Sequence, residues 1–344
     1  MRKNRRKTAY HRRIGGLSVI IPATNSPVTL DATVAAIERS FEPPDELIVV
    51  HTAPRPGPAA ARNDGARQAS GDILVFIDAD VRVHGDALTR IRTAFAADPS
   101  LAAVFGSYDD APSEDAIVSS FRNLLHHHVH TTSAGPATTF WAGVGAIRRD
   151  AFFAVGGFDD HRYPKPSIED IDLGSRLHEA GFRIVLDPAI QGTHLKRWTL
   201  ASMVKTDLLQ RGVPWVELLL SGRGDRNALN LGWRHRVSAL ASIALVGSVV
   251  TRRAGAAGAS LLALGAANHS FYSLLARRRG PVGAAVGVLL HAVHHLTAVA
   301  AAPLGLLAYV RRRYGAVEVD GEAPVAERLV DGLDRPHDVE PDDR

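Results

Sequence analysis

The chain of 344 residues contains no cysteine, which excludes disulfide bonds and thiolate metal sites. A metal ion would therefore have to be held by Asp, Glu, His or water, and this set of ligands suits Mg²⁺ or Mn²⁺. Hydrophobic residues make up 46% of the sequence, which is compatible with a substantial core. We expect the chain to fold without covalent cross-links.

Acidic residues are absent from the first 13 positions, which carry seven Lys or Arg residues. No apolar segment follows this basic arm, so a secretory signal peptide is disfavoured. The arm has no interleaved aromatic platform on which bases could stack. We therefore expect it to lie near anionic lipid, and we expect no nucleic-acid partner.

Charged residues are absent from three segments near the carboxyl end, which cover residues 237–250, 254–276 and 281–310. The last two are long enough to span a bilayer, which takes about 20 residues, whereas the first is short and could be interfacial or re-entrant. Arginines separate the segments, and their distribution favours two spans with the amino-terminal part in the cytoplasm. We expect a multi-pass protein of the inner (plasma) membrane; the alternative is a set of buried helices in a soluble domain.

The fingerprint G-x-G-x-x-G is absent after the first predicted strand, where the sequence is Pro22-Ala23-Thr24-Asn25, and a nicotinamide-type dinucleotide is disfavoured. Predicted strands alternate with predicted helices over the first part of the chain. The strands cover residues 17–22, 46–50 and 73–77, and the helices cover residues 26–40 and 58–69. This order predicts an α/β domain with a doubly wound, mostly parallel, Rossmann-like sheet.

Two aspartates, Asp78 and Asp80, follow directly after the apolar run of residues 73–77. Such a run is typical of a strand buried on both faces, and the i, i+2 spacing places both carboxylates on one side if the chain stays extended. Ligands of open α/β sheets bind at the carboxyl ends of the strands. The pair therefore indicates a divalent metal that carries a phosphorylated substrate, and the alternative is a pair of turn residues.

Further motifs occur in a fixed order along the chain. They are Ile20-Ile21-Pro22, Ala61-Arg62-Asn63-Asp64-Gly65, Phe140 to Arg149, Val155-Gly156-Gly157-Phe158-Asp159, Ile168 to Leu177 and His194-Leu195-Lys196-Arg197-Trp198. Together with the aspartate pair they resemble the family-2 glycosyltransferases of bacterial, membrane-attached type. The resemblance covers about residues 17–215 and implies a GT-A fold and an inverting enzyme that uses nucleotide-diphosphate sugars.

The resemblance also implies a role for each matching residue. A nucleotide-sugar-binding wall would be formed by Pro22, Ala23, Thr24, Arg62, Asn63 and Asp78. Arg197 and Trp198 match a motif beside the acceptor channel. We expect Trp141, Gly143 and Glu169 on the acceptor side as well, and close helix–sheet packing is the alternative for Gly143. Asp80 matches the metal-binding carboxylate, and His194, which replaces the glutamine of a Gln-x-x-Arg-Trp motif, could be a second metal ligand. The second strand is followed by His51 instead of an acidic residue, which leaves uridine and guanosine both open.

Asp170 matches the general base of the family. A carboxylate suits this task because it can accept the proton of an acceptor hydroxyl as the new bond forms. The alternative is structural, since Ser167 and Asp170 have the spacing of a capping box. Asp172 lies two positions further on, roughly 200° around a helix, and should face elsewhere. The histidines of residues 126–130 are expected on a helix that lines the acceptor side, with zinc binding as the alternative.

The predicted organisation has five regions. They are a basic disordered arm (1–16), a GT-A domain (17–200), interfacial amphipathic helices beginning with Arg197 and Trp198 (201–236), two or three membrane helices (237–313) and an acidic disordered tail (314–344). The predicted activity is transfer of a sugar from a nucleotide-diphosphate sugar, with Mg²⁺ or Mn²⁺, to a lipid-linked or membrane-presented glycan. The alternatives are a polyprenyl-phosphate glycosyltransferase and a catalytically silent sugar-nucleotide-binding scaffold in the membrane.

Overall fold

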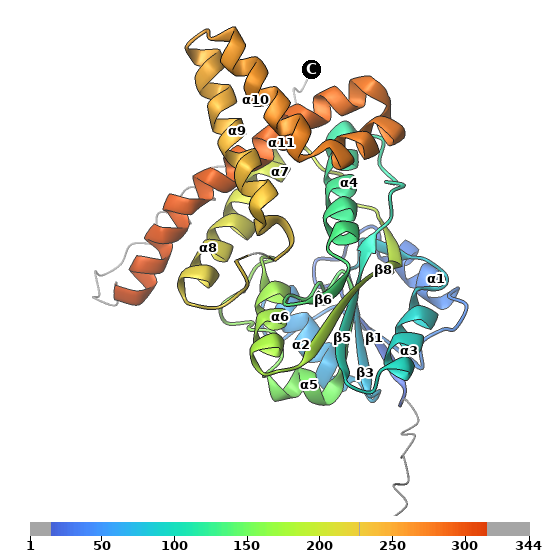
Figure 1. Ribbon diagram of the computed structural model, residues 1–344. Coiled ribbons are helices and arrows are strands. Elements are labelled where there is room, and N and C mark those ends of the chain that lie inside the picture. Colours follow the sequence, from blue (N-terminus) through green and yellow to red (C-terminus); the bar gives the residue numbers. More distant parts are fainter. Residues whose placement is uncertain (1–14, 227, 315–344) are drawn as a thin grey trace, which may run out of the picture.

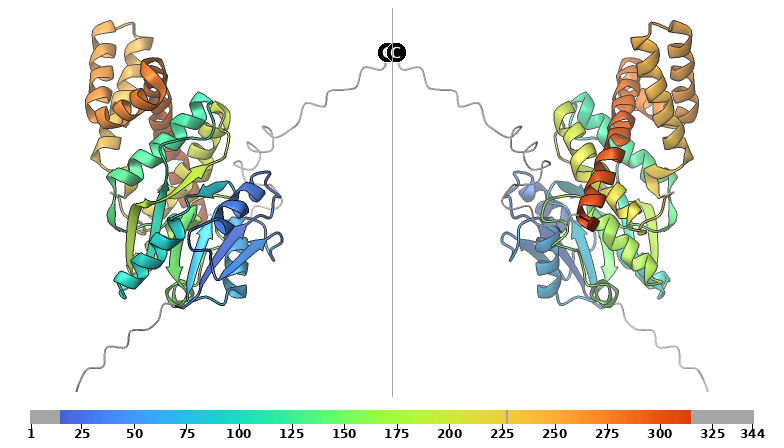
Figure 2. Two further views of the ribbon diagram at one scale, coloured as in Figure 1. Left: turned by 90° about the vertical axis from the view of Figure 1, so that its right-hand side faces the viewer. Right: turned by 90° about the vertical axis from the view of Figure 1, so that its left-hand side faces the viewer.

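The computed structural model describes residues 15–226 and 228–314 (Figure 1). The basic arm predicted over 1–16 and the acidic tail predicted over 314–344 lie outside these residues, except for their innermost positions. Within the described part, an eight-stranded sheet with its helices forms one end of the molecule. Further helices from the second half of the chain stand at the other end (Figures 1 and 2).

The sheet is mixed. Its strands are β1 (Leu17–Pro22), β2 (Glu46–Val50), β3 (Ile73–Ile77), β4 (Val81–Val83), β5 (Leu101–Tyr108), β6 (Gly135–Ala137), β7 (Val144–Arg148) and β8 (Arg183–His194). Their order is β2-β1-β3-β7-β5-β8-β4, and β6 pairs with β8. β1 is parallel to β2 and β3, and β5 is parallel to β8. β7 is antiparallel to β3 and β5, and β4 and β6 are antiparallel to β8.

The α/β class predicted from the sequence is confirmed, but the expectation of a mostly parallel sheet is wrong. The three predicted strands β1, β2 and β3 are present with the predicted bounds and are parallel to one another. The antiparallel pairs come from the later strands, for which hydrophobic runs carry no information about direction. The first helix, predicted from residue 26, begins only at Leu30, because Ser26 has a left-handed backbone conformation (φ 47°).

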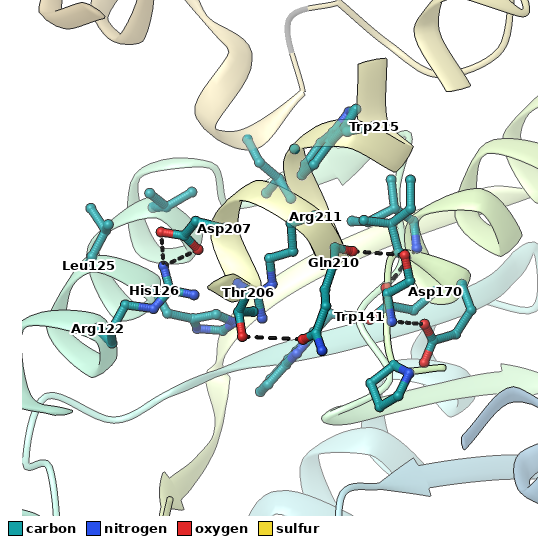
Figure 3. A pocket seen from close by; sticks show the side chains of 18 of the residues that line it. Arg122, Leu125, His126, Trp141, Asp170, Thr206, Asp207, Gln210, Arg211 and Trp215 are labelled. Carbon is teal, nitrogen blue, oxygen red and sulfur yellow. Dashed lines mark hydrogen bonds and ion pairs between the residues drawn. The ribbon is translucent and has the colours of Figure 1, made fainter. Parts of the chain in front are cut away.

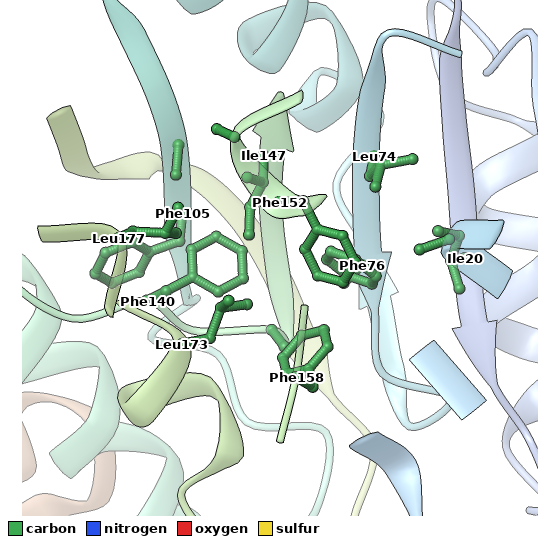
Figure 4. Close-up of a cluster of buried hydrophobic side chains, with 14 of the residues drawn as sticks. Ile20, Leu74, Phe76, Phe105, Phe140, Ile147, Phe152, Phe158, Leu173 and Leu177 are labelled. Atoms are coloured by element: carbon green, nitrogen blue, oxygen red, sulfur yellow. The ribbon is translucent and has the colours of Figure 1, made fainter. Parts of the chain in front are cut away.

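Helices cover both faces of the sheet. They are α1 (Leu30–Glu38), α2 (Pro58–Gln68), α3 (Ala87–Ala97), α4 (Ile117–Thr132), α5 (Arg149–Ala154) and α6 (Glu169–Glu179). Leu74 and Phe76 of β3 pack with α2, α5 and α6 on one face (Figure 4). Ile73, Val75 and Ile77 pack with α1 and α3 on the other face. The alternation explains why all five residues of β3 are apolar and buried.

The second half of the chain is helical after β8. It forms α7 (Leu200–Lys205), the π-helical turn η1 (Thr206–Gly212), α8 (Val213–Leu220), the 3₁₀ turn η2 (Leu229–Leu231), α9 (Trp233–Val250), α10 (Ala254–Ala267) and α11 (His269–Tyr314). A positive φ at Gly280 (70°) breaks α11 into two parts. Phe271, Leu274 and Leu290 of α11 pack with Phe121 of α4 and with Trp198, so these helices are attached to the sheet domain.

One described helix, α11, is long and apolar enough to cross a membrane. The continuous helix predicted over 254–276 is wrong, because α10 ends at Ala267 and Asn268 follows in a non-helical conformation. The side-chain amide of Asn268 donates to Ser238 Oγ (2.8 Å) and to the carbonyl of Leu264 (3.0 Å), which fixes the break. The prediction of two or three membrane-spanning helices is therefore reduced to one candidate helix.

Candidate active site

A large cavity of about 1180 Å³ opens at one edge of the sheet (Figure 3). The carboxyl ends of β1, β3, β5 and β8 meet at this edge. The start of β7 lies there too, because β7 is antiparallel to β3 and β5. Thr24, Asp78, Tyr108, Trp141 and His194 line the cavity from these five strands or the residues beside them. The site therefore lies where ligands of α/β sheets are expected.

Arg62 on α2 is the buried cation at the sheet end of the cavity. Its guanidinium donates to Asp78 Oδ1 (2.6 Å) and to Glu169 Oε1 (2.8 Å), so one side chain joins α2, the end of β3 and the start of α6. Burial acts to lower the pKa of Arg62, but the charges of Asp78 and Glu169 raise it. Burial and the charge of Asp80 raise the pKa of Asp78, against the lowering effect of Arg62. Arg62 therefore holds the carboxylates of Asp78 and Glu169 in place at the cavity wall.

Asp80 faces a histidine on the neighbouring part of the edge. Its Oδ2 lies 3.5 Å from Nε2 of His194, whose ring stacks on Tyr108 with centroids 4.3 Å apart. Burial acts to raise the pKa of Asp80, but His194 and Lys196 more than offset this and lower it. The carbonyl of Ala79 accepts from the hydroxyls of Thr29 and Thr33, which positions the residues between β3 and β4.

The Asp80–His194 pair fits a divalent cation that takes its remaining ligands from a substrate. Among the residues that the structure describes, no three His, Cys, Asp or Glu side chains are grouped closely enough to hold a metal ion by themselves. Mg²⁺ is usually bound through one or two carboxylates together with substrate phosphates and water. Asp80 offers a carboxylate oxygen of this kind, and His194 beside it offers an imidazole nitrogen, which Mn²⁺ accepts more readily than Mg²⁺.

Asp170 lies in the first turn of α6 and lines the same cavity. Its Oδ2 accepts from the backbone N–H of Ala142 at 3.2 Å. Burial and the charge of the adjacent Glu169 raise the pKa of Asp170 to about 7, although Arg62 opposes the shift. A carboxyl group with such a pKa can accept a proton near neutral pH.

The capping alternative for Asp170 is wrong. The N-cap of α6 is Ile168, and no side chain caps the helix. Ser167 Oγ instead donates to the carbonyl of Gln210 (2.8 Å), and the Ser167 backbone N–H donates to Glu169 Oε2 (2.8 Å). Asp172 faces away from the cavity as predicted; it is buried and accepts from Nε of Arg176 at 2.8 Å.

Several residues expected in the site do not line the cavity. They are Ala23, Asn63, Gly143 and Arg197. The Asn63 side chain exchanges hydrogen bonds with the backbone of Phe158 (2.8 and 2.9 Å), so it fixes the segment before α6. A Cβ at Gly143 would lie 2.2 Å from the ring of Trp141, so this glycine leaves room for the tryptophan.

Trp198 is buried. The prediction that it lies on a surface helix is therefore wrong. It packs in the apolar cluster with Phe121 and Phe271, and the guanidinium of Arg122 lies 5.0 Å from its ring centroid. The helix that follows begins only at Leu200, where Thr199 forms a capping box with Ser202. The tryptophan therefore lines the cavity from the inside of the fold.

Sequence reasoning missed the residues that line the cavity from η1. These are Thr206, Asp207, Gln210, Arg211 and Gly212. Asp207 is buried and binds Arg122 at 2.8 Å and His294 Nδ1 of α11 at 2.8 Å. Burial acts to raise the pKa of Asp207, but these partners lower it well below its usual range. A π-helical turn has no clear sequence pattern, so nothing in the sequence indicated this wall.

His126, His127 and His130 of α4 follow the expectation of a helix beside the cavity. His126 and His130 line it, and their ring centroids are 3.9 Å apart. Nδ1 of His130 pairs with the carbonyl of Gly106 and Nδ1 of His127 with that of Tyr108, both at 2.8 Å. Burial lowers the pKa of His130 to about 4, so its ring is neutral at physiological pH.

Known proteins that are similar to this chain include glycosyltransferases. A profile of the family described as glycosyl transferase family 2 matches residues 48–155. The chain is 27% identical over 298 residues to the pre-mycofactocin glycosyltransferase of Mycobacterium tuberculosis, with 79% of this chain and 63% of that protein covered. It is 26% identical over 179 residues to the poly-β-1,6-N-acetyl-D-glucosamine synthase of Staphylococcus aureus, with 50% of this chain and 41% of that protein covered.

The chain thus spans less than two thirds of the length of these relatives. Among solved structures, a mannosyltransferase from Pyrobaculum calidifontis in complex with GDP-Man and Mn²⁺ is 17% identical, with a TM-score of 0.47 and 88% of each chain covered. The family profile includes the segment from β2 to α5, and with it Arg62, Asp78 and Asp80. The chain is thus similar to members of glycosyl transferase family 2 over this segment.

Proposed function

We propose that the protein is an inverting glycosyltransferase of GT-A type that uses a nucleotide-diphosphate sugar as donor. The observation that carries this proposal is that Asp78, Asp80 and Asp170 line one cavity although they come from two distant parts of the chain. A silent scaffold would not require a carboxyl group whose pKa is raised to about 7 beside the aspartate pair.

In this proposal the donor lies along Pro22 and Thr24, with its diphosphate near Asp80 and His194. A divalent cation held by these two residues would supply the positive charge that stabilises the departing diphosphate. Arg62 keeps Asp78 in place at the nucleotide side through their 2.6 Å contact. The nucleotide base, uridine or guanosine, is left open because His51 replaces the usual acidic residue.

Asp170 would act as the general base. The oxygen of an acceptor hydroxyl attacks the anomeric carbon of the donor as the bond from that carbon to the diphosphate oxygen breaks. The hydroxyl proton passes to the Asp170 carboxylate, and the nucleoside diphosphate leaves with the electron pair of the broken bond. Attack from the face opposite the leaving group inverts the anomeric configuration. The Ala142 N–H at 3.2 Å keeps the carboxylate oriented during this step.

We further propose a lipid-linked or membrane-presented glycan as acceptor, at the inner face of the plasma membrane. Residues 17–200 would form the catalytic domain, and residues 201–313 would attach it to the membrane. Two observations support this arrangement. α11 is long and apolar enough to cross a bilayer, and His294 and Val299 of α11 line the cavity itself. The acceptor would thus enter from the side on which the attaching helices lie.

The donor and metal assignment is tested by thermal unfolding of the full chain with UDP, GDP and their sugars, with and without Mn²⁺. A ligand present at 100 times its Kd stabilises a protein by about 2.7 kcal/mol, so binding raises the Tm. Asp80→Asn should remove most of the Mn²⁺-dependent rise. Asp64→Asn is the matched control, because Asp64 lies on α2 and pairs with Arg67 outside the cavity. Full activity of the wild-type enzyme in EDTA would refute the metal assignment.

A further inference from the structure

The two ends of the cavity differ in charge. At the sheet end the lining includes four carboxylates, which belong to Asp78, Asp80, Glu169 and Asp170, and two basic residues, Arg62 and Lys165. At the helical end the basic lining residues are Arg122, Arg211, Arg226 and Arg236, and Lys196 lies between the two ends because its charge also acts on Asp80. One carboxylate, that of Asp207, accompanies them in the described lining. The helical end therefore carries an excess of positive charge, which favours an anionic ligand.

Asp207 offsets only the charge of Arg122 and leaves Arg211 without a carboxylate partner, because its two oxygens are already engaged by Arg122 and His294. Arg211 is exposed and forms no ion pair with any carboxylate in the described part of the chain. Figure 3 shows its side chain pointing from η1 into the cavity, toward the side on which His126 and Trp141 lie. Lys196 is also exposed, and its ammonium group lies 4.4 Å from the ring centroid of Trp198.

The basic end is connected directly to the proposed base. Gln210, the neighbour of Arg211, accepts a hydrogen bond through its carbonyl from Ser167 Oγ at 2.8 Å. Ser167 lies three positions before Asp170, and both line the cavity. The turn η1, which carries Arg211, is therefore attached to the segment that leads into α6 and Asp170.

The lining from the helices of the second half of the chain also contains apolar side chains. It includes Val216, Leu219 and Leu220 of α8, Ala239 of α9, and Ala298 and Val299 of α11. These helices are the ones that we propose attach the domain to the membrane. A ligand that extends from Asp170 toward α8, α9 and α11 would thus meet both cations and hydrocarbon-like surface.

We infer that the acceptor is an anionic lipid, in which a phosphate binds Arg211 and Lys196, a hydrocarbon chain lies between α8, α9 and α11, and a hydroxyl group reaches Asp170. The inference rests on the proposed function, because it names the acceptor class for that reaction. Guanidinium groups form strong, geometrically matched hydrogen bonds with phosphate oxygens, and a lysine adds a point charge. An uncharged glycolipid would leave Arg211 without an anionic partner.

The test is direct binding of decyl phosphate to the full chain in detergent, followed by tryptophan fluorescence because Trp141, Trp198 and Trp215 line the cavity. Arg211→Gln and Lys196→Gln should each weaken binding about tenfold, the effect of losing one charge-assisted hydrogen bond. Decanol should bind more weakly than decyl phosphate and should not respond to either change. Inorganic phosphate, which has no hydrocarbon chain, should also bind more weakly.

Arg253→Gln is the control, because Arg253 is an exposed arginine of the same helical region outside the cavity. It should leave decyl phosphate binding unchanged, and an equal loss in this variant would show general adsorption and overturn the inference. Unchanged binding in Arg211→Gln, or equal binding of inorganic phosphate, would overturn it as well. So would competition between decyl phosphate and UDP or GDP with Mn²⁺, which would assign the basic end to the donor.

Failure of the inference and failure of the proposed function are distinguishable. Asp80→Asn should lose Mn²⁺-dependent nucleotide binding and keep decyl phosphate binding, whereas Arg211→Gln should do the reverse. If nucleotides do not bind the wild-type chain at all, the proposed function fails even when decyl phosphate binds. If nucleotides bind normally and decyl phosphate does not, only the acceptor assignment fails.

Discussion

The sheet end and the helical end of the cavity differ in how their charged side chains are held. At the sheet end, Arg62 is clamped between Asp78 and Glu169, and Asp170 is oriented by a backbone N–H. At the helical end, Arg211 is exposed and forms no ion pair with a carboxylate of the described residues. The rigid sheet end suits a reaction that requires fixed distances between groups. The less constrained helical end suits recognition of a long, flexible molecule.

The substitution with the largest expected effect is Asp170→Asn, at the sheet end. The amide keeps the shape of the side chain but cannot accept the proton of the acceptor, so turnover should fall about 10²–10⁴-fold with donor affinity nearly unchanged. Initial rates at saturating donor and a nucleotide-binding curve measure the two effects. Turnover close to wild type would mean that no base is needed, as when a lipid phosphate is itself the nucleophile in a polyprenyl-phosphate glycosyltransferase.

Asp172→Asn is the control for this change, and we expect it to act on stability instead. Asp172 is buried and holds Arg176 by a 2.8 Å contact, so the amide weakens a buried ion pair. Its Tm should fall while turnover per folded molecule is retained. The opposite pattern, with turnover abolished only in Asp172→Asn, would show that the catalytic carboxylate has been assigned to the wrong residue.

A second test addresses the rigidity of the sheet end. Arg62→Met leaves Asp78 and Glu169 without their buried cation, and removing one partner of a buried ion pair costs about 3–5 kcal/mol. Arg67→Met on the same helix removes an exposed pair with Asp64 and should cost at most about 1 kcal/mol. Urea unfolding of both variants measures the difference. Similar losses in the two would show that the clamp does not stabilise the fold.

The smallest expected effect is the pH dependence of the rate. Because burial and Glu169 raise the pKa of Asp170 to about 7, the base form is lost as the pH falls below 7. kcat/KM should then fall about tenfold for each further pH unit, which corresponds to about 1.4 kcal/mol. Asp170→Asn should abolish this acid limb. An acid limb near pH 4 in the wild type would contradict the raised pKa.

Much of the sheet end was predictable from the sequence, because its signals are local. The apolar run of residues 73–77 indicated a strand buried on both faces, and the aspartates that follow it line the cavity as expected. Asp170 reaches the same cavity, and Asp172 faces away, as helix geometry requires. The roles proposed for these residues remain predictions.

The helical end was not predictable in the same way, because its signals are tertiary. The burial of Trp198 depends on packing with Phe271, which lies far along the chain. Composition identified residues 254–276 as apolar, but the side chain of Asn268 ends a helix inside that segment by bonding to Ser238. Hydropathy alone does not contain these contacts.

The position of β4 has a consequence for the synthesis of the protein. β4 begins immediately after Asp80, yet it pairs with β8, the last strand of the sheet in chain order, and Val81 lies opposite His194. Non-local strand pairing forms slowly, because a long loop must be closed before the contacts can stabilise it. A nascent chain grows from its amino end at about 5–20 residues per second, so Asp80 leaves the ribosome well before its partner. The Asp80–His194 pair can therefore form only after β8 has docked, and metal affinity would report completion of the sheet in a refolding experiment.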